Sequence, residues 1–161
     1  MILYHGSNAN FDVFDLTFTK KGKDFGRGIY LTTSKKQALK WAIRFNKGYI
    51  YECELNDSLL EERNDLKIKA LLEYNTEWLD FIVNCRIKGH EPQYDIVYDR
   101  MADNTYKNLS ELLIRYYNDV INPQVVLSKV RWKNKEFDQY CFKTDKALKY
   151  LRIISKEEVY R

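Results

Sequence analysis

Three residues suited to chemistry on a nucleotide sugar lie in three distinct segments of this chain. They are His5 in LYHGS (residues 3–7), Tyr30 in FGRGIYLT (25–32) and Gln139 in DQYCF (138–142). An imidazole can hydrogen-bond a ribose hydroxyl, a tyrosine ring can stack on a planar heterocycle, and a glutamine amide can donate and accept hydrogen bonds. These groups suit cleavage of the nicotinamide–ribose bond of NAD, which places positive charge on the sugar as glycoside hydrolysis does.

His5 is expected at the end of a short strand, because residues 1–5 are largely apolar and Gly6 and Ser7 follow. Gly6 has no side chain, so its backbone could approach a ligand amide, and Ser7 would add a hydroxyl. The alternative is a structural histidine at a strand end with Gly6 in a turn. The tripeptide alone favours that alternative.

Tyr30 and Trp41 form a candidate aromatic clamp for a planar ring. Tyr30 lies in an expected strand over residues 29–32. Trp41 lies in a helix that Ser34 is expected to cap and that runs to about Asn46, with Gly48 as its stop signal. A strand, a tight turn and a helix can bring two rings face to face. Core packing is the alternative for Trp41, and filling of the sheet is the alternative for Tyr30.

Gly26-Arg27-Gly28 could bring backbone and a guanidinium toward a diphosphate. No P-loop and no complete G-x-G-x-x-G accompanies it, so a parallel dinucleotide-binding fold is not indicated. Gln139 begins an expected strand and could orient a ribose, but its amide carries no negative charge. An ordinary edge-strand glutamine is the alternative. Glu136 or Asp138 is a candidate acceptor-side base on sequence proximity alone.

Length and composition indicate a single domain spanning residues 1–161. The chain has 45% hydrophobic residues, 6 Gly and 2 Pro, and no linker-like stretch. No apolar run reaches the ~18 to 20 residues of a membrane span, and no basic, apolar leader precedes His5. We therefore expect a soluble, cytoplasmic protein without a membrane partner.

The cysteines and the charge balance narrow the ligand classes further. Cys53, Cys85 and Cys141 contain no C-x-x-C pair, so neither a disulfide framework nor a metal site is expected, and Cys53 and Cys141 are expected to be buried in strands. The net charge of +4 suits a polyphosphate ligand without demanding nucleic acid. The alternating Lys129, Arg131, Lys133 and Lys135 would line one face only in an extended segment, so a solvated surface is favoured over a nucleic-acid-binding site.

The order of elements predicts an α+β fold. Strands are expected at 1–5, 29–32, 49–55, 66–72, 94–98, 139–143 and 151–154, with short strands at both ends of the chain and helices clustered between. Helices are expected after Ser34, after a Thr76 cap, over 109–120, from Pro123 and around 145–149, with a helical turn between 55 and 66. Without regular strand–helix alternation, a mixed or antiparallel sheet is favoured over a doubly wound parallel sheet.

At these segments the sequence resembles the ADP-ribosyltransferases of the diphtheria-toxin and poly(ADP-ribose) polymerase group, and within it the small bacterial DUF3990 family. Its three motifs match His5-Gly6-Ser7, then Phe25 to Tyr30 with Trp41 as the second stacking aromatic, then Asp138 to Phe142 with Ala147 and Leu151. The resemblance covers essentially the whole chain, including residues 37–42, 78–81 and 94–97. It implies a split pair of small mixed or antiparallel sheets with peripheral helices.

The resemblance also implies roles for individual residues. His5 and Gly6 would hold ribose and carboxamide, Tyr30 and Trp41 would sandwich nicotinamide, and Gln139 would orient the reacting ribose. The implied activity is NAD-dependent mono-ADP-ribosylation by a toxin-like or effector-like enzyme. NAD would be a substrate, the acceptor an unidentified protein or nucleic acid, and an antitoxin protein a further candidate partner.

Two departures from the group bear on this expectation. Gln139 replaces the usual glutamate, which disfavours polymer elongation and suggests single transfer, an unusual acceptor or a weak enzyme. Ala38 stands where polymerases of the group often have serine, so Ser7 becomes the candidate hydroxyl for the carboxamide. An NAD-binding pseudoenzyme or interaction module of the same fold is therefore an alternative.

Overall fold

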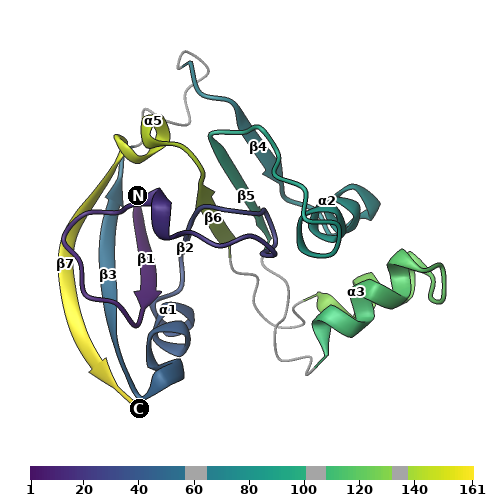
Figure 1. Cartoon of the computed structure of the whole chain (residues 1–161), viewed down its shortest axis with the longest axis horizontal. Coiled ribbons are helices and arrows are strands. Elements are labelled where there is room, and N and C mark those ends of the chain that lie inside the picture. The colour runs from purple at the N-terminus through teal and green to yellow at the C-terminus, as the bar shows by residue number, and fades with distance from the viewer. Residues whose placement is uncertain (57–64, 101–107, 132–137) are drawn as a thin grey trace.

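The fold is built on a mixed sheet of seven strands (Figure 1). The computed structural model describes residues 1–56, 65–100, 108–131 and 138–161. The strands are β1 (Ile2–Ser7), β2 (Ile29–Thr32), β3 (Lys47–Leu55), β4 (Ile68–Leu71), β5 (Ile96–Arg100), β6 (Asp138–Phe142) and β7 (Leu151–Tyr160). Their order is β4-β5-β6-β2-β1-β3-β7, with β4 and β5 parallel and all other neighbours antiparallel. The predicted α+β class is confirmed.

The sheet has a narrow junction between its two halves. β1 pairs with β3 along its whole length, from Ile2↔Glu54 to Ser7↔Tyr49, but its register with β2 is limited to Tyr4↔Thr32. The expected split into two sheets therefore needs correction, because the strands form one hydrogen-bonded sheet. One residue beyond this pair, the imidazole of His5 contacts the carbonyl oxygen of Tyr30. A side chain thus satisfies a strand carbonyl where the register between the two strands ends.

Helices flank the sheet. They are α1 (Lys35–Ala42), α2 (Thr76–Arg86), α3 (Leu109–Tyr117), α4 (Pro123–Val130) and α5 (Asp145–Leu148), with 3-10 turns η1 (Leu16–Phe18) and η2 (Ile43–Phe45). Ser34 caps α1 by accepting from the backbone N–H of Gln37, as predicted. Asn75 rather than Thr76 caps α2. Its side chain accepts from Trp78, so the cap lies one residue earlier than the sequence suggested.

Helix α1 ends differently from the prediction. Its last turn tightens into η2, and Asn46 follows with a left-handed φ of 74°. Gly48 is not the stop signal but lies inside β3, where a Cβ atom would come within 2.0 Å of the carbonyl oxygen of Ala42. Gly6 on β1 faces α1 in the same way, since its Cβ would lie 1.9 Å from the carbonyl oxygen of Ala38. These glycines allow α1 to pack against the backbone of β1 and β3.

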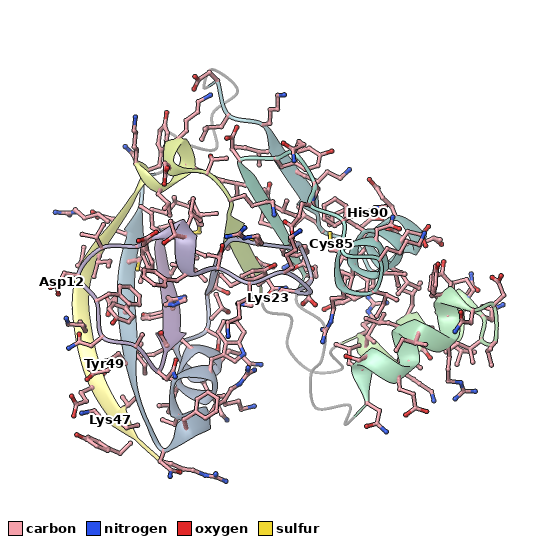
Figure 2. All side chains as sticks on the ribbon, viewed as in Figure 1. Asp12, Lys23, Lys47, Tyr49, Cys85 and His90 are labelled. Atoms are coloured by element: carbon pink, nitrogen blue, oxygen red, sulfur yellow. The ribbon has the colours of Figure 1, made fainter. Side chains whose placement is uncertain are left out.

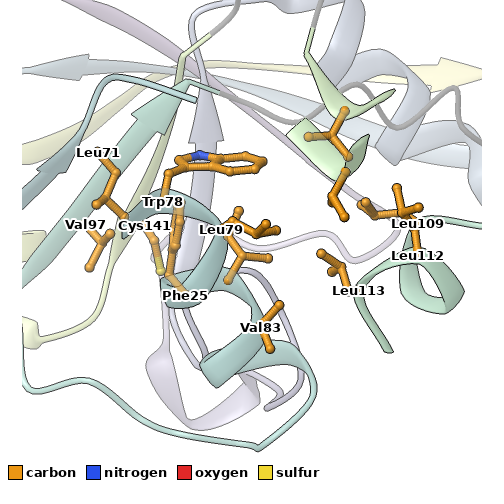
Figure 3. Packing of buried hydrophobic residues seen from close by; sticks show 13 residues of the cluster. Phe25, Leu71, Trp78, Leu79, Val83, Val97, Leu109, Leu112, Leu113 and Cys141 are labelled. Atoms are coloured by element: carbon orange, nitrogen blue, oxygen red, sulfur yellow. The ribbon is translucent and has the colours of Figure 1, made fainter. Parts of the chain in front are cut away.

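Two large apolar clusters lie on the sheet. In the first (Figure 3), Trp78 and Leu79 of α2 lie between sheet residues such as Val97 and the leucines of α3. The second contains Leu3, Tyr51 and Phe142 from both halves of the sheet. Since strands from both halves share this second cluster, the narrow β1–β2 junction is supported by packing as well as by backbone pairing.

The three cysteines are free and buried. Cys53 and Cys141 are buried in β3 and β6, which confirms their predicted role as small core residues, and Cys85 is buried in α2. Lys129 lies in α4, so the alternating basic run does not form one extended strand; Lys133 and Lys135 lie outside the described residues, as does the predicted helical turn near 57–64. Among the helices of the described part, none has the length and apolar character to cross a membrane.

Candidate active site

A cavity of about 980 Å³ opens beside the β1–β2 junction. Its lining contains every predicted site residue except Arg27, namely His5, Gly6, Ser7, Gly28, Tyr30, Trp41 and Gln139. They come from β1, from β2 with the loop before it and α1 after it, and from β6, which are three segments far apart in sequence. A volume of this size is at the upper end of the range for small-molecule and cofactor sites.

The half-buried His5 is held in one orientation by aromatic neighbours and by one hydrogen bond. Its ring lies 5.4 to 5.9 Å from the rings of Phe11, Phe14 and Tyr51. Its Nδ1 lies 2.7 Å from the carbonyl oxygen of Tyr30, so Nδ1 carries the proton and donates it. Burial lowers the pKa of His5 from 6.5 to about 4. The imidazole is therefore neutral at physiological pH, and Nε2 is a hydrogen-bond acceptor.

Tyr30 is fixed by the residues that precede it. Its hydroxyl donates to the carbonyl oxygen of Gly26 at 2.7 Å and accepts from the backbone N–H of Phe25 at 2.9 Å. The ring of Phe25 stacks against it, with centroids 5.9 Å apart. Burial raises the pKa of the Tyr30 hydroxyl well above its usual range, so this hydroxyl stays protonated. Because its hydroxyl is engaged in these hydrogen bonds, Tyr30 can contact a ligand through its ring.

Lys23 already places a cation against that ring. Its Nζ lies 5.1 Å from the centroid of Tyr30. Figure 2 labels Lys23 on the long loop between β1 and β2. A cation over an aromatic face is attracted by the ring quadrupole, so this position also suits the positively charged ring of oxidised nicotinamide. Trp41 lines the same cavity, and no ring contact joins it to Tyr30 within the described residues.

The glycine-rich loop has a structural role that the sequence did not reveal. The backbone N–H of Arg27 donates to Glu91 at 2.9 Å, and Nζ of Lys143 donates to the carbonyl oxygens of Phe25 and Arg27, each at 2.6 Å. The Arg27 side chain is exposed and is not part of the cavity lining. The loop therefore positions Tyr30, and the structure does not bring the Arg27 guanidinium to the site.

Gly6 lines the cavity, but its lack of a side chain has another physical cause, the close approach of α1. Ala38, whose carbonyl oxygen makes this approach, is itself fully buried. Ser7 also lines the cavity, and its Oγ accepts from the backbone N–H of Ala9 at 3.1 Å. Its hydroxyl hydrogen remains available to a ligand carbonyl.

Gln139 is linked through Asp24 to Arg86 and lies opposite Asp99 on the neighbouring strand. Its Nε2 donates to Oδ2 of Asp24 at 3.2 Å, and Oδ1 of Asp24 accepts from Arg86 at 2.8 Å. On the neighbouring strand, Asp99 is the register partner of Gln139 and is fully buried. Gln139 is itself only 4% exposed, so it is not an ordinary solvent-facing edge glutamine.

Basic side chains from segments without a readable motif also reach the cavity. They are Lys20, Lys23, Arg44 and Arg86. Lys23 lies over the Tyr30 ring and Arg86 pairs with Asp24. Lys20 and Arg44 suit a diphosphate better than Arg27 does, because Arg27 lies outside the lining. Sequence reasoning missed them because lysine and arginine are common on any surface. The exposed Phe18 and Phe45 add apolar rim to the same cavity.

The acceptor-side base suggested by sequence proximity finds no support at Asp138. Its carboxylate pairs with Arg100 at 2.8 Å and does not line the cavity. Glu136 lies outside the described residues. Asp24, which the sequence did not single out, is the acid of the cavity lining that contacts Gln139.

The fold and the cavity together define an α+β protein whose single sheet carries one large polar and aromatic site at its central junction. The chain belongs to the DUF3990 family, described as a protein family of unknown function, whose model matches residues 1–153. A comparison with curated proteins found no match to this chain.

Proposed function

We propose that this protein is an NAD-dependent mono-ADP-ribosyltransferase. The observation that carries the proposal is the presence of His5, Tyr30, Trp41 and Gln139 around one cavity. These residues come from three distant segments whose motifs resemble those of ADP-ribosyltransferases. The fixed His5–Tyr30 hydrogen bond and the neutral state of the imidazole support it further.

In this proposal Tyr30 and Trp41 hold the nicotinamide ring from the walls of the cavity. The Nε2 of His5 accepts a hydrogen bond from a ribose hydroxyl, because Nδ1 is committed to the Tyr30 carbonyl. Arg44 and Lys20 lie among the lining residues and would pair with the diphosphate. The uncharged Gln139 orients the reacting ribose.

The reaction breaks the bond between C1′ of ribose and the nicotinamide nitrogen. Both electrons of that bond leave with the nitrogen, so nicotinamide departs neutral and C1′ carries the positive charge. A nucleophilic oxygen or nitrogen of the acceptor then forms a bond to C1′ and loses its proton to solvent. The acceptor, a protein or a nucleic acid, and a neutralising antitoxin protein belong to the same proposal.

Incubation with labelled NAD and a cell lysate tests the activity. The wild-type protein should transfer label to a macromolecule and release nicotinamide. His5→Ala and Tyr30→Ala should each abolish both products. His90→Ala and Tyr117→Ala are matched controls, because both residues are exposed and neither lines the cavity. Equal labelling by wild type, His5→Ala and Tyr30→Ala would refute the site assignment.

An NAD-binding pseudoenzyme or interaction module is the second candidate, favoured by the neutral, buried amide of Gln139. Calorimetry combined with chromatography separates the two. Nucleotide binding without nicotinamide release over hours supports the module, and rapid release eliminates it.

A further inference from the structure

The proposed reaction creates positive charge on ribose, and Gln139 has no charge to oppose it. A fixed anion beside that sugar would stabilise the charge in a water-poor site. Within the described residues the cavity lining includes two acids, Asp15 and Asp24. Asp15 is exposed, and its Oδ1 is engaged in capping η1 through the backbone N–H and hydroxyl of Thr17. Asp24 is the acid placed deeper in the site.

Asp24 is bonded on both oxygens to residues of the same cavity. Oδ1 accepts from Arg86 at 2.8 Å, and Oδ2 accepts from Nε2 of Gln139 at 3.2 Å. Its side chain is 12% exposed, compared with 23% for Arg86. A carboxylate has about four acceptor positions, so these two contacts leave acceptor capacity for ribose hydroxyls.

The chain also ties Asp24 to the proposed nicotinamide clamp. The next residue, Phe25, stacks on Tyr30 and donates its backbone N–H to the Tyr30 hydroxyl. Lys143 holds the carbonyl oxygen of Phe25 at 2.6 Å. The carboxylate and the aromatic ring are therefore fixed by one hydrogen-bonded loop, and they line the same cavity.

Asp99 does not fit this role, although it is the register partner of Gln139. It is fully buried and is not part of the cavity lining. Burial, followed by the nearby charge of Asp24, raises the pKa of Asp99 well above its usual range. Burial therefore disfavours the charged form of Asp99, which lies beneath the site.

We infer that Asp24 is a catalytic carboxylate of this site and supplies, from the loop before Tyr30, the negative charge that Gln139 lacks. This inference rests on the proposed function. As the C1′–nitrogen bond breaks and its electrons leave with nicotinamide, Asp24 faces the cationic ribose. Gln139 and Arg86 hold the carboxylate in place, and the paired Arg86 guanidinium offsets part of its negative charge.

Asp24→Asn tests the charge with little change of shape. An asparagine can still accept from Arg86, and the Gln139 amide can turn to present its oxygen. We expect nicotinamide release to fall about 100-fold in kcat, the scale seen when one group that stabilises transition-state charge is removed. Binding of NADH, whose nicotinamide ring is uncharged, should stay within about twofold of wild type and so report an intact cavity. Asp12→Asn is the matched control, because Asp12 is exposed on the same loop, pairs with Lys156 at 2.8 Å and is not part of the lining.

A rescue experiment adds a second readout. In the Asp24→Asn background, Gln139→Glu returns one negative charge to the neighbouring position, and release should recover at least about tenfold. Unchanged kcat in Asp24→Asn, or failure of this rescue, would overturn the inference.

Calorimetry separates this inference from the proposed function. Wild type should prefer NAD⁺ over NADH, and Asp24→Asn should lower that preference about fivefold. Binding of both nucleotides without release of nicotinamide would refute the proposed activity. The change in preference for NAD⁺ over NADH in Asp24→Asn would still decide the role of the Asp24 charge. Binding of neither nucleotide would refute both.

Discussion

Nδ1 of His5 lies 2.7 Å from the carbonyl oxygen of Tyr30 and joins β1 to β2 just beyond their last registered pair. This bond gives His5 two separable roles, one structural through Nδ1 and one toward a ligand through Nε2. An asparagine side chain can reproduce the Nδ1 donor but not the Nε2 acceptor.

His5→Asn should therefore stay close to wild type in stability while its Kd for NAD rises at least about tenfold. His5→Ala should also lose nucleotide binding. In addition, its free energy of unfolding should fall by about 1 to 3 kcal/mol, because the Tyr30 carbonyl would lack its hydrogen-bond partner. Urea unfolding and calorimetry measure the two effects. Equal NAD affinity of His5→Asn and wild type would show that Nε2 does not contact the nucleotide.

The lowered pKa of His5 predicts acid sensitivity of the fold. The folded state binds the second imidazole proton, which makes His5 cationic, less tightly than the unfolded state does. The neutral His5 therefore contributes fully to stability above pH 6.5, and this contribution is lost as pH falls toward 4. The loss should approach roughly 3 kcal/mol in the free energy of unfolding. His5→Asn should remove this part of the pH dependence. Parallel pH profiles of urea midpoints for the two proteins would contradict the assignment.

Lys23 should compete with NAD for the face of Tyr30. Lys23→Met removes the ammonium 5.1 Å from that ring and should tighten NAD binding about fivefold. Lys47→Met is the matched control, because Lys47 also lies over tyrosine rings but is not part of the cavity lining. Weaker binding by Lys23→Met would instead indicate that Lys23 contacts the nucleotide phosphates.

Asp99 should destabilise the fold at high pH. Its folded-state pKa is raised, so the folded protein is most favoured while Asp99 is protonated, and stability falls as pH rises through the usual aspartate range and beyond. Asp99→Asn should gain stability over wild type at pH 8 relative to pH 4, because an asparagine carries no charge to bury. Thermal unfolding over this range tests it. A gain that is the same at both pH values would show that the pKa of Asp99 is not raised in the folded protein.

Local signals in the sequence predicted most elements of the fold. Ser34 and Pro123 mark the starts of α1 and α4, and apolar periodicity located α2 and α3. β7 is longer than predicted, because residues such as Glu157 and Glu158 give no apolar alternation. They nevertheless pair with β3 and form ion pairs with Lys35 and Lys47.

The candidate site was predictable only in part. His5, Tyr30 and Gln139 lie in recognisable motifs. Asp24, by contrast, reaches the site through contacts with Gln139, 115 positions away, and with Arg86, 62 positions away. No local pattern encodes such contacts. Gly6 was predicted to face the ligand, but the sequence did not show its second role. A glycine is also required there because α1 approaches its backbone closely.

The proposed site is tested most directly by a crystal structure of the protein with a non-hydrolysable carbocyclic NAD analogue. The pyridinium ring should lie between Tyr30 and Trp41, with a ribose hydroxyl within hydrogen-bond distance of Nε2 of His5. An analogue bound at another surface, or a cavity left empty at millimolar analogue, would contradict it.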